Sequence, residues 1–260
     1  MTAVLHKSLP LFPWEDPRTA RLPGIQPLQG DDWLCLDEAF AGQMALRDRL
    51  IAGAAPVHAL LPEAEGAAAE LYALCLQKLA GRSGYSIGPE IACRPDGVDV
   101  PLTPEAPLLT LGRLVQEDLC LLQPGPGGDY RLTGAILCFP ASWTLAEKIG
   151  RPMTAIHLPV PQYNDDIARR VGRMFQAIRP EQPLWRMNHN LADSPDLFHP
   201  RKEADPRKRT HPQFVRAERQ CLLRLPETQA IVFTIHTCLM RLSDLPRGPR
   251  NSLLAAHGAG

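Results

Sequence analysis

The amino-acid sequence predicts an α+β fold, in which a helical N-terminal half precedes a mostly antiparallel sheet. Two stretches with helical periodicity lie between residues 37 and 82, whereas the apolar stretches after about residue 105 are short and separated by turn residues. One more helical stretch interrupts this second half. Strands and helices do not alternate along the chain as they do in a doubly wound fold. We therefore expect an antiparallel sheet with flanking helices.

The composition is that of a folded globular protein with an excess of proline. Hydrophobic residues make up 45% of the 260 residues, and 28 Lys+Arg balance 28 Asp+Glu. This neutrality argues against binding to nucleic acid or to a membrane surface, because both usually require an excess of positive charge. The 27 prolines are about twice the usual share of roughly 5%, and they predict long ordered connections between short elements.

The cysteines and the N-terminus indicate a cellular location. Seven cysteines are scattered without a CxxC pair, and several lie in apolar strings, where a free thiol behaves as a small hydrophobic residue. This pattern predicts a reducing compartment, and it argues against an iron–sulfur cluster or a structural zinc on this chain. There is no signal-peptide pattern and no window near the roughly 18 apolar residues of a membrane span. We therefore expect a cytoplasmic protein.

Three segments make up the expected N-terminal half. Residues 1–30 are proline-rich and aperiodic, which indicates an arm laid over the fold and anchored by side chains such as Phe12 and Trp14. A helix is predicted to begin at about Asp37, whose side chain would cap it. The strongest helix follows within residues 63–82. It is rich in alanine, has its basic residues late, and ends near a glycine.

The second half is expected to supply the sheet. Residues 111–123 and 130–140 predict a hairpin around PGPGGD, a turn that lacks the Lys-Ser/Thr pair and the helix of a phosphate-binding loop. A compact helix is predicted over 162–178, and a loop with aromatic and amide groups over 185–200. The remaining segments are a second hairpin formed by residues 214–225 and 229–240, and a flexible tail over 246–260 after a single domain over 31–245.

Eight histidines occur without an HxH or HxxxH pair, so a site with several histidine ligands would require distant segments to converge. His157 lies in the apolar stretch AIHLPVP, where two prolines restrict the backbone. A neutral imidazole held rigidly in a dry pocket suits an axial metal ligand, although a buried histidine bonded to a carbonyl group is the alternative. His236 in VFTIHTCL has the same two interpretations. Four histidines are expected on the solvated surface: His6, His199, His211 and His257.

Charged residues interrupt the apolar stretch FVRAERQCLLR. Arg216, Glu218 and Gln220 share one face of the expected strand, with Arg219 on the other face. Charged groups in an otherwise apolar strand are costly unless they are paired. They indicate either an ion pair at the edge of the sheet or the polar wall of a pocket that binds a ligand. The chain has no GxSxG, HExxH or Walker motif, and no GxGxxG that opens a helix.

The segments FPASWTLAEKIGRPMTAIHLPVP and ERQCLLRLP are the most specific of several motifs between about residues 8 and 245. Together they resemble the haem-dependent oxidative N-demethylase α-subunit family, a dimethylamine monooxygenase-like family formerly described as a domain of unknown function. The resemblance implies a PAS-like haem-binding domain. It also implies a monooxygenase subunit that uses haem b and dioxygen to remove a methyl group from a small alkylamine such as dimethylamine, with release of formaldehyde.

The resemblance further implies a partner that supplies electrons. A separate reductase would carry FMN, a 2Fe-2S cluster and NADPH, in agreement with the lack of CxxC pairs and nucleotide motifs in this chain. The basic stretch within 201–209 would dock an acidic domain of that reductase, or it is solvated surface. Its charged residues are Arg201, Lys202, Arg207, Lys208 and Arg209.

The resemblance also suggests roles for individual residues. His157 falls in the strongest motif and is the expected proximal ligand of the haem iron. Arg219 and Glu218 fall in the ERQ motif, where they would act on the distal side, Arg219 by polarising bound dioxygen and Glu218 by holding an amine cation. The WRxN segment is expected to line the pocket or to bind a haem propionate, through Trp185, Arg186 and Asn188.

Two segments depart from the family pattern. The family tends to have Trp at position 189 and Arg-Thr-Tyr at 236–238, where this chain has His189 and His236-Thr237-Cys238. His189 or His236 would then line the pocket or supply a second haem ligand. A second ligand would close the oxygen site, so the alternative function is a haem-PAS gas or redox sensor, or a binding protein, without turnover.

Overall fold

The structure is a computed structural model that describes residues 3–20, 24–30, 32–126, 129–156, 165–206 and 211–257, with the side chains of 165–169 excepted. The strands are β1 (Gln26–Pro27), β2 (His58–Leu60), β3 (Ser86–Ile87), β4 (Ile91–Cys93), β5 (Asp99–Pro101), β6 (Asp118–Pro124), β7 (Tyr130–Ile136), β8 (Leu184–Ala192), β9 (Phe214–Arg224) and β10 (Ile231–Arg241). The α-helices are α1 (Phe40–Ala52), α2 (Glu65–Ala80), α3 (Pro107–Gly112), α4 (Leu145–Lys148), α5 (Met153–Ile156), α6 (Asp165–Ala177) and α7 (Arg247–Ala256).

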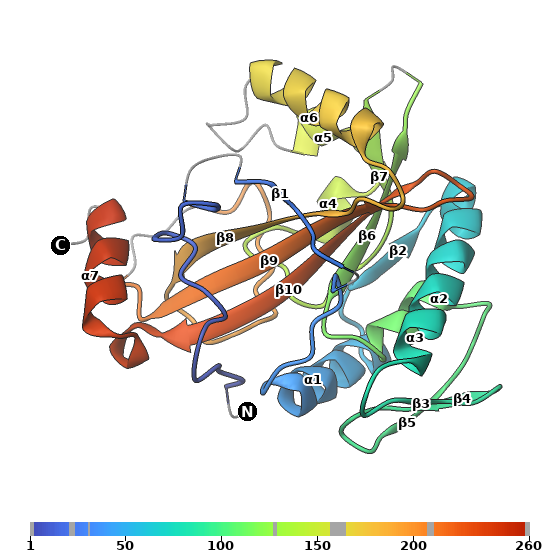
Figure 1. Ribbon diagram of the computed structural model, residues 1–260, viewed down its shortest axis with the longest axis horizontal. Helices are drawn as coiled ribbons and strands as arrows, with labels where there is room; N and C mark the ends of the chain where they lie inside the picture. Colours follow the sequence, from blue (N-terminus) through green and yellow to red (C-terminus); the bar gives the residue numbers. More distant parts are fainter. Residues whose placement is uncertain are drawn as a thin grey trace.

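A seven-stranded sheet forms the framework, in the order β1-β8-β9-β10-β6-β7-β2, and its paired strands are antiparallel (Figure 1). A second sheet of three short strands, β3-β4-β5, lies to one side of it. Both predicted hairpins are confirmed, since β6 pairs with β7 and β9 pairs with β10. The turn of the second hairpin places Gln229 at a φ of 59°. The α+β fold class predicted from the sequence is therefore confirmed.

The helices begin and end close to their predicted positions. Helix α2 ends at Ala80, directly before Gly81. Helix α1 begins at Phe40, three residues later than predicted. The prediction that the Asp37 side chain caps this helix is wrong, because the N-cap residue is Ala39 and no side chain caps it; Asp37 Oδ1 instead accepts a hydrogen bond from the Ala39 N–H at 2.9 Å. None of the described helices is both long enough and apolar enough to cross a bilayer.

Strand β8 corrects one prediction. The loop expected over 185–200 is wrong for residues 185–192, which pair with β9 from Leu184 opposite Leu222 to Ala192 opposite Phe214. Polar and apolar residues alternate along this strand with period two, as in a strand with one polar face. The amide and charged residues on that polar face gave the segment the composition of a loop. Besides the four strands of the two predicted hairpins, the large sheet therefore contains β8, with β1 and β2 at its edges.

Helices cover the two faces of the sheet differently. On the α1/α2 face, the side chains of Leu119, Leu121 and Leu223 belong to the same apolar cluster as those of α2. On the opposite face, which we call the α5/α6 face, Leu122 and Leu222 belong to a cluster with residues of α5 and α6. Figure 1 shows α5 and α6 above the sheet, and α1 below it. These two faces hold the two groups of polar residues discussed below.

The two ends of the chain meet beside the sheet. Leu9, Phe12 and Trp14 of the N-terminal arm pack in one apolar cluster with Met187 of β8 and Leu253 of α7. The Trp14 Nε1–H donates a hydrogen bond to the main-chain oxygen of Pro249 at 2.9 Å. Residues 247–256, which we expected in a flexible tail, form helix α7, and Leu253 is fully buried. Because α7 buries this leucine, it is ordered beyond the end of the predicted domain.

Candidate functional site

A row of polar side chains crosses the α5/α6 face on β9. The Glu218 carboxylate accepts hydrogen bonds from Arg216 Nε and from Gln220 Nε2, both at 3.1 Å. Arg216 is 4% exposed and Glu218 is 7% exposed. Strand β9 lies between β8 and β10, so this ion pair is inside the sheet and not at its edge. A buried pair of this kind persists only when its remaining polar atoms are also satisfied.

The other hydrogen bonds of Arg216 fix its position. Nη1 donates to the main-chain oxygen of Leu197 at 3.0 Å, and Nη2 donates to that of Phe139. Nη2 also lies 3.4 Å from Thr237 Oγ1. The guanidinium group is thus held by main-chain oxygens from two loops as well as by Glu218. Because these contacts fix Arg216, the Glu218 carboxylate is the acceptor on this face that can also bind a ligand.

Strand β8 continues the polar row. Arg186 lies opposite Gln220, and Asn188 lies opposite Glu218, on the same face of the sheet. Arg186 Nε and Asn188 Oδ1 are buried atoms without a hydrogen-bond partner. Burial lowers the pKa of Arg186, and the negative charge of Glu218 raises it in part. Buried polar atoms are rarely left unpaired in a native protein, so these two atoms point to a polar ligand on this face.

The segment that holds His157 starts and ends on the same face. Residues 157–164, including His157, lie outside the described residues. Ile156, the last residue of α5, packs against the apolar cluster of the α5/α6 face, as do Met174 and Phe175 of α6. The buried Lys148 donates a hydrogen bond from Nζ to the main-chain oxygen of Ile156 at 2.9 Å and also pairs with Glu203. The described residues on both sides of the segment therefore pack on the α5/α6 face.

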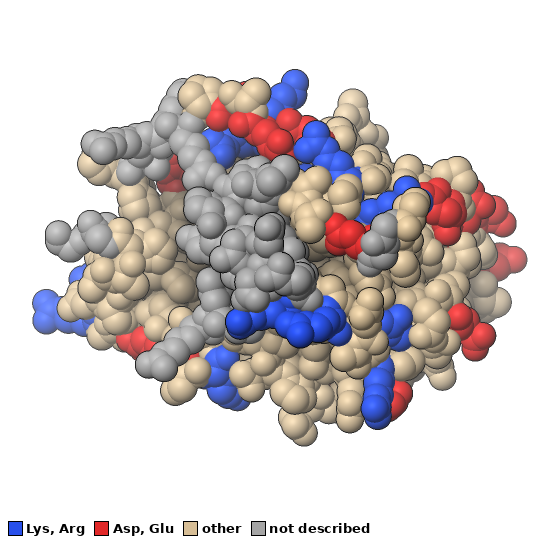
Figure 2. Space-filling view, turned by 90° about the horizontal axis from the view of Figure 1, so that it is seen from above, with Lys and Arg blue, Asp and Glu red and all other residues tan. Residues whose placement is uncertain are grey.

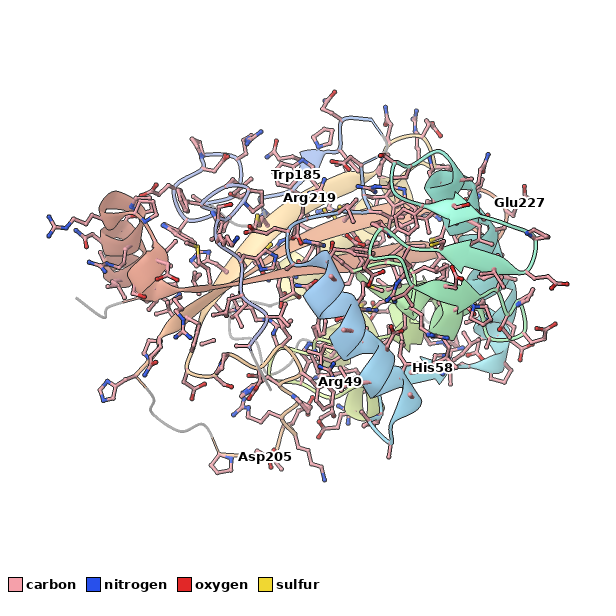
Figure 3. All side chains as sticks on the ribbon, turned by 90° about the horizontal axis from the view of Figure 1, so that it is seen from below. Arg49, His58, Trp185, Asp205, Arg219 and Glu227 are labelled. Carbon is pink, nitrogen blue, oxygen red and sulfur yellow. The ribbon has the colours of Figure 1, made fainter. Side chains whose placement is uncertain are left out.

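Arg219 and Trp185 face the opposite way. The guanidinium carbon of Arg219 lies 5.9 Å from the centre of the Trp185 ring, and the group donates to Cys35 Sγ at 2.9 Å and to the main-chain oxygen of Asp32 at 2.7 Å. Figure 3 shows Trp185 and Arg219 next to each other. Neighbouring residues of a strand point to opposite faces, so Arg219 and Glu218 cannot line the same side of the sheet. The structure instead places Glu218 with Arg186 and Asn188.

Comparison with known families now adds to this geometry. The family model described as haem-dependent oxidative N-demethylase, alpha subunit-like, matches residues 24–258. The chain belongs to this family. The match covers the whole of the large sheet, including the polar residues of β8, β9 and β10. The family's description indicates that haem and oxidative demethylation are involved.

The α5/α6 face offers suitable contacts for the haem of this family. A haem combines a flat apolar ring with two carboxylates. The described apolar side chains on this face, including Phe175, Leu222 and Ile235, suit the ring. The buried, unpaired Nε atom of the half-buried Arg186 suits a carboxylate. The residues present on this face therefore fit the group, and the predicted ligand His157 lies in the segment between α5 and α6.

His189 lies beneath the N-terminal arm and α7. Its ring centre is 5.2 Å from those of Trp14 and His257, and both contacts are edge-on. Burial lowers the pKa of His189, and together with the neighbouring His257 it brings the value to about 4. The odd-numbered residues of β8, including His189 and Trp185, point away from the α5/α6 face. The structure therefore separates His189 from Arg186 and Asn188.

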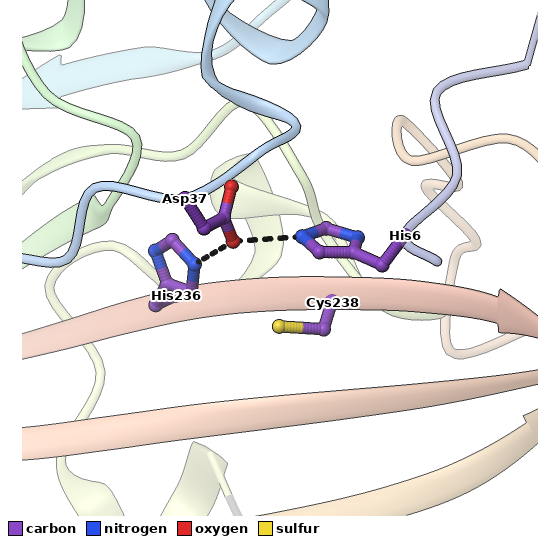
Figure 4. Close-up of side chains that lie close together, drawn as sticks. All are labelled: His6, Asp37, His236 and Cys238. Carbon is purple, nitrogen blue, oxygen red and sulfur yellow. Dashed lines mark hydrogen bonds and ion pairs between the residues drawn. The ribbon is translucent and has the colours of Figure 1, made fainter. Parts of the chain in front are cut away.

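His236 belongs to a charged network on the α1/α2 face (Figure 4). Its Nε2 lies 2.8 Å from Asp37 Oδ2, and its Nδ1 lies 3.0 Å from Glu117 Oε1. Burial lowers the pKa of His236, but the hydrogen bonds to these carboxylates and to Cys238 raise it well above its usual value. Both ring nitrogens are thus occupied, on the face opposite the polar row of Arg216 and Glu218.

His6 completes this network, and the prediction made for it from the sequence is wrong. We expected a solvated histidine, but His6 is 3% exposed and its Nε2 lies 2.8 Å from Asp37 Oδ2. The arm reaches this position because the His6 N–H donates to the main-chain oxygen of Leu239 at 2.7 Å. His211 and His257 are exposed as expected, and His199 is half-buried. No local pattern around His6 signals this contact, since its partners are far away in the sequence.

Proposed function

We propose that this chain is the haem-binding subunit of an oxidative N-demethylase that removes a methyl group from a small alkylamine, such as dimethylamine, and releases formaldehyde. The observation that carries the proposal is the buried Glu218 on the α5/α6 face, next to two polar atoms without partners. An alkylammonium ion in an apolar pocket requires a carboxylate counter-charge. Glu218 supplies one on a face that also suits a haem. The expected PAS-like fold agrees with this arrangement, since the helices α4–α6 lie between the strands β7 and β8.

Each residue of the polar row has a distinct task in this proposal. The haem, when bound, supplies the activation of dioxygen. Arg216 fixes the direction of the Glu218 carboxylate through its hydrogen bond. Glu218 binds the ammonium group and so orients the methyl group toward the reacting centre. Arg186 would hold a propionate of the haem, and His157 would ligate its iron. Arg219 is left out of this pocket, because its guanidinium group is bound to Cys35 and Asp32 on the other face.

The proposal includes a separate reductase that delivers electrons through FMN and a 2Fe-2S cluster. Of the basic stretch expected to dock it, Arg201 and Lys202 are described, and residues 207–209 lie outside the described residues. Lys202 is exposed, and its N–H donates to Asp205 Oδ2 at 2.9 Å. Figure 2 shows basic and acidic side chains interspersed over the described part of the face seen from above the view of Figure 1. Docking would therefore depend on a local cluster of basic residues and not on the overall charge of the chain.

Absorption spectroscopy and a formaldehyde assay test the proposal together. The purified protein should show a Soret band, and with dioxygen, a reductase and dimethylamine it should release formaldehyde. Glu218→Gln should keep the Soret band and lose most of the formaldehyde release, with a raised KM for the amine. The matched control Glu90→Gln, an exposed carboxylate between β3 and β4, should keep both. A protein that binds haem and dimethylamine without releasing formaldehyde would instead be a sensor or binding protein, and a protein without a Soret band would refute the proposal.

A further inference from the structure

Four potential metal ligands from three distant segments converge on the α1/α2 face (Figure 4). His6 comes from the N-terminal arm, Asp37 from the loop before α1, and His236 and Cys238 from β10. One ligand atom from each residue lies within 4.8 Å of those of the other three. The two histidines and the cysteine are buried, and Asp37 is partly buried. None of these residues belongs to the haem face described above.

We propose that His6, Asp37, His236 and Cys238 bind one divalent transition-metal ion, which their donor set identifies as Zn²⁺. Two imidazole nitrogens, one carboxylate oxygen and one thiolate form a four-ligand set of the kind that zinc prefers. All four positions are filled by the protein, so the site is closed, as structural zinc sites are. The lack of CxxC pairs argued against zinc in the sequence, but these ligands come together only in the fold.

The residues around the ligands hold them in place for a metal ion. The Nδ1 of His236 faces Glu117 Oε1 at 3.0 Å, which is the carboxylate–histidine arrangement found behind many metal-bound histidines. Asp37 Oδ1 accepts hydrogen bonds from the Ala39 N–H at 2.9 Å and from Gln116 Nε2 at 2.8 Å. Its second oxygen, Oδ2, is thereby directed at both imidazoles. The ligand atoms are thus oriented by groups outside the cluster.

A separate observation, on the carboxylate of Glu117, also points to a cation beside the cluster. Glu117 is fully buried, and its Oε2 has no hydrogen-bond partner. Its other oxygen, Oε1, accepts from the Cys35 N–H at 2.6 Å and faces His236. A buried carboxylate with one unsatisfied oxygen is costly. A dication bound to Nε2 of His236 would compensate the charge of this carboxylate through the imidazole ring, whose Nδ1 faces Glu117 Oε1.

Metal binding changes the positions of protons in the cluster. Asp37 Oδ2 lies 2.8 Å from the Nε2 atoms of both His6 and His236. The metal ion displaces the protons on these nitrogens and on Cys238 Sγ, and the protons that the rings do not keep are released to solvent. His236 keeps its proton on Nδ1, facing Glu117. The proton of His6 moves to Nδ1, so the ring gives up the contact of 3.2 Å with the Leu239 N–H. The His6 N–H still donates to the Leu239 oxygen, so the arm stays in place.

Metal analysis of the full-length protein, with its haem, tests this proposal. We expect one zinc per chain in addition to the haem iron. Cys238→Ser and His236→Asn should each lose most of the zinc. The matched controls are Cys93→Ser in β4 and His257→Asn after α7, which should keep it. Haem content and the near-ultraviolet circular dichroism of each variant show whether it has folded.

Cobalt provides a second measurement, which begins with the wild-type protein. After removal of zinc with a chelator, Co²⁺ added to the wild-type protein should give the visible bands of a tetrahedral ion and a sulfur-to-cobalt charge-transfer band. Cys93→Ser should keep the charge-transfer band, and Cys238→Ser should lose it. The proposal is overturned if neither zinc nor cobalt binds at one equivalent per chain, in which case the four residues form a hydrogen-bonded network only. That outcome would leave the haem proposal unaffected, since the two sites lie on opposite faces of the sheet.

Discussion

Each face of the central sheet carries a buried group of polar residues. The residues of one group are close together in the sequence, and those of the other group are far apart. On the α5/α6 face, Arg216 and Glu218 are two residues apart on one strand and pair with each other. On the α1/α2 face, Asp37 joins His6 and His236, which are 31 and 199 residues away along the chain. The first group is thus a local product of strand geometry, whereas the second exists only once the arm, the loop before α1 and β10 have come together.

This difference indicates what each group does. The local pair is adjacent to unsatisfied atoms of Arg186 and Asn188, so it has the properties of a ligand-binding surface. The distant cluster connects the N-terminal arm to the centre of the sheet, so it has the properties of a structural clamp. Ligand removal should therefore affect the first face through binding and the second face through the order of the arm. If the two polar groups differ in this way, substitutions and metal removal should act on them differently.

Breaking the local pair should cause the largest loss of stability. Arg216→Met leaves the Glu218 carboxylate buried without its cation, and we expect the free energy of unfolding to fall by about 3–5 kcal/mol. Urea unfolding, monitored by circular dichroism, measures it. The control is Arg219→Met on the opposite face, which removes hydrogen bonds to Cys35 and Asp32 worth about 1 kcal/mol each.

A double variant separates the charge from the packing. Adding Glu218→Leu to Arg216→Met removes both members of the pair, and replacing both ions by apolar groups is often close to neutral. The double variant should therefore be more stable than Arg216→Met alone. If it is less stable, the two residues contribute through their packing, and the buried ion pair is not the feature that matters on this face.

Removal of zinc from the α1/α2 face should have an intermediate effect on the stability of the protein. Zinc that binds only the folded protein stabilises it by about 2.7 kcal/mol at a free concentration 100 times the Kd. Chelation should lower the Tm accordingly and should make the arm, which includes Lys7, a faster substrate for trypsin. Cleavage at Lys202 on the opposite side provides the internal reference. Equal acceleration at both lysines would mean that the metal acts on the whole fold and not on the arm.

The two faces also differ in how far the sequence predicted them. Both hairpins, and the shared face of Arg216, Glu218 and Gln220, follow from the period of two along a strand, so they could be read directly. Strand β8 was missed because Arg186 and Asn188 face a polar surface, and a half-polar strand has the composition of a loop. The alternation of polar and apolar residues along β8 could have predicted the strand, but its amide residues favoured a loop.

The cluster on the α1/α2 face could not be predicted in the same way. Spacing rules detect ligands that share a helix or a loop, whereas His6 and His236 belong to segments whose meeting depends on tertiary packing. The chemistry of each residue gave no indication either, because a histidine near the N-terminus is usually solvated. The position of Arg219 has a simpler cause. A shared motif placed it with Glu218, but neighbouring residues of a strand always face opposite sides.

The smallest effect concerns pH and His189, which touches neither polar group. Its pKa of about 4 in the folded protein is below the usual 6.5 of an unfolded chain, because burial disfavours the charged ring and His257 of the adjacent segment adds repulsion. The unfolded chain therefore binds more protons below pH 6.5, and the free energy of unfolding should fall as the pH is lowered from 6.5 toward 4. His189→Asn removes this contribution, so the difference in stability between pH 7 and pH 5 should be smaller in the variant than in the wild type. Urea unfolding at the two pH values measures it, with His211→Asn, an exposed histidine, as the control that should behave as the wild type. An unchanged pH dependence in His189→Asn would mean that the ring beneath the arm is solvated enough to titrate normally, and that the arm covers this end of the sheet less tightly than it covers His6.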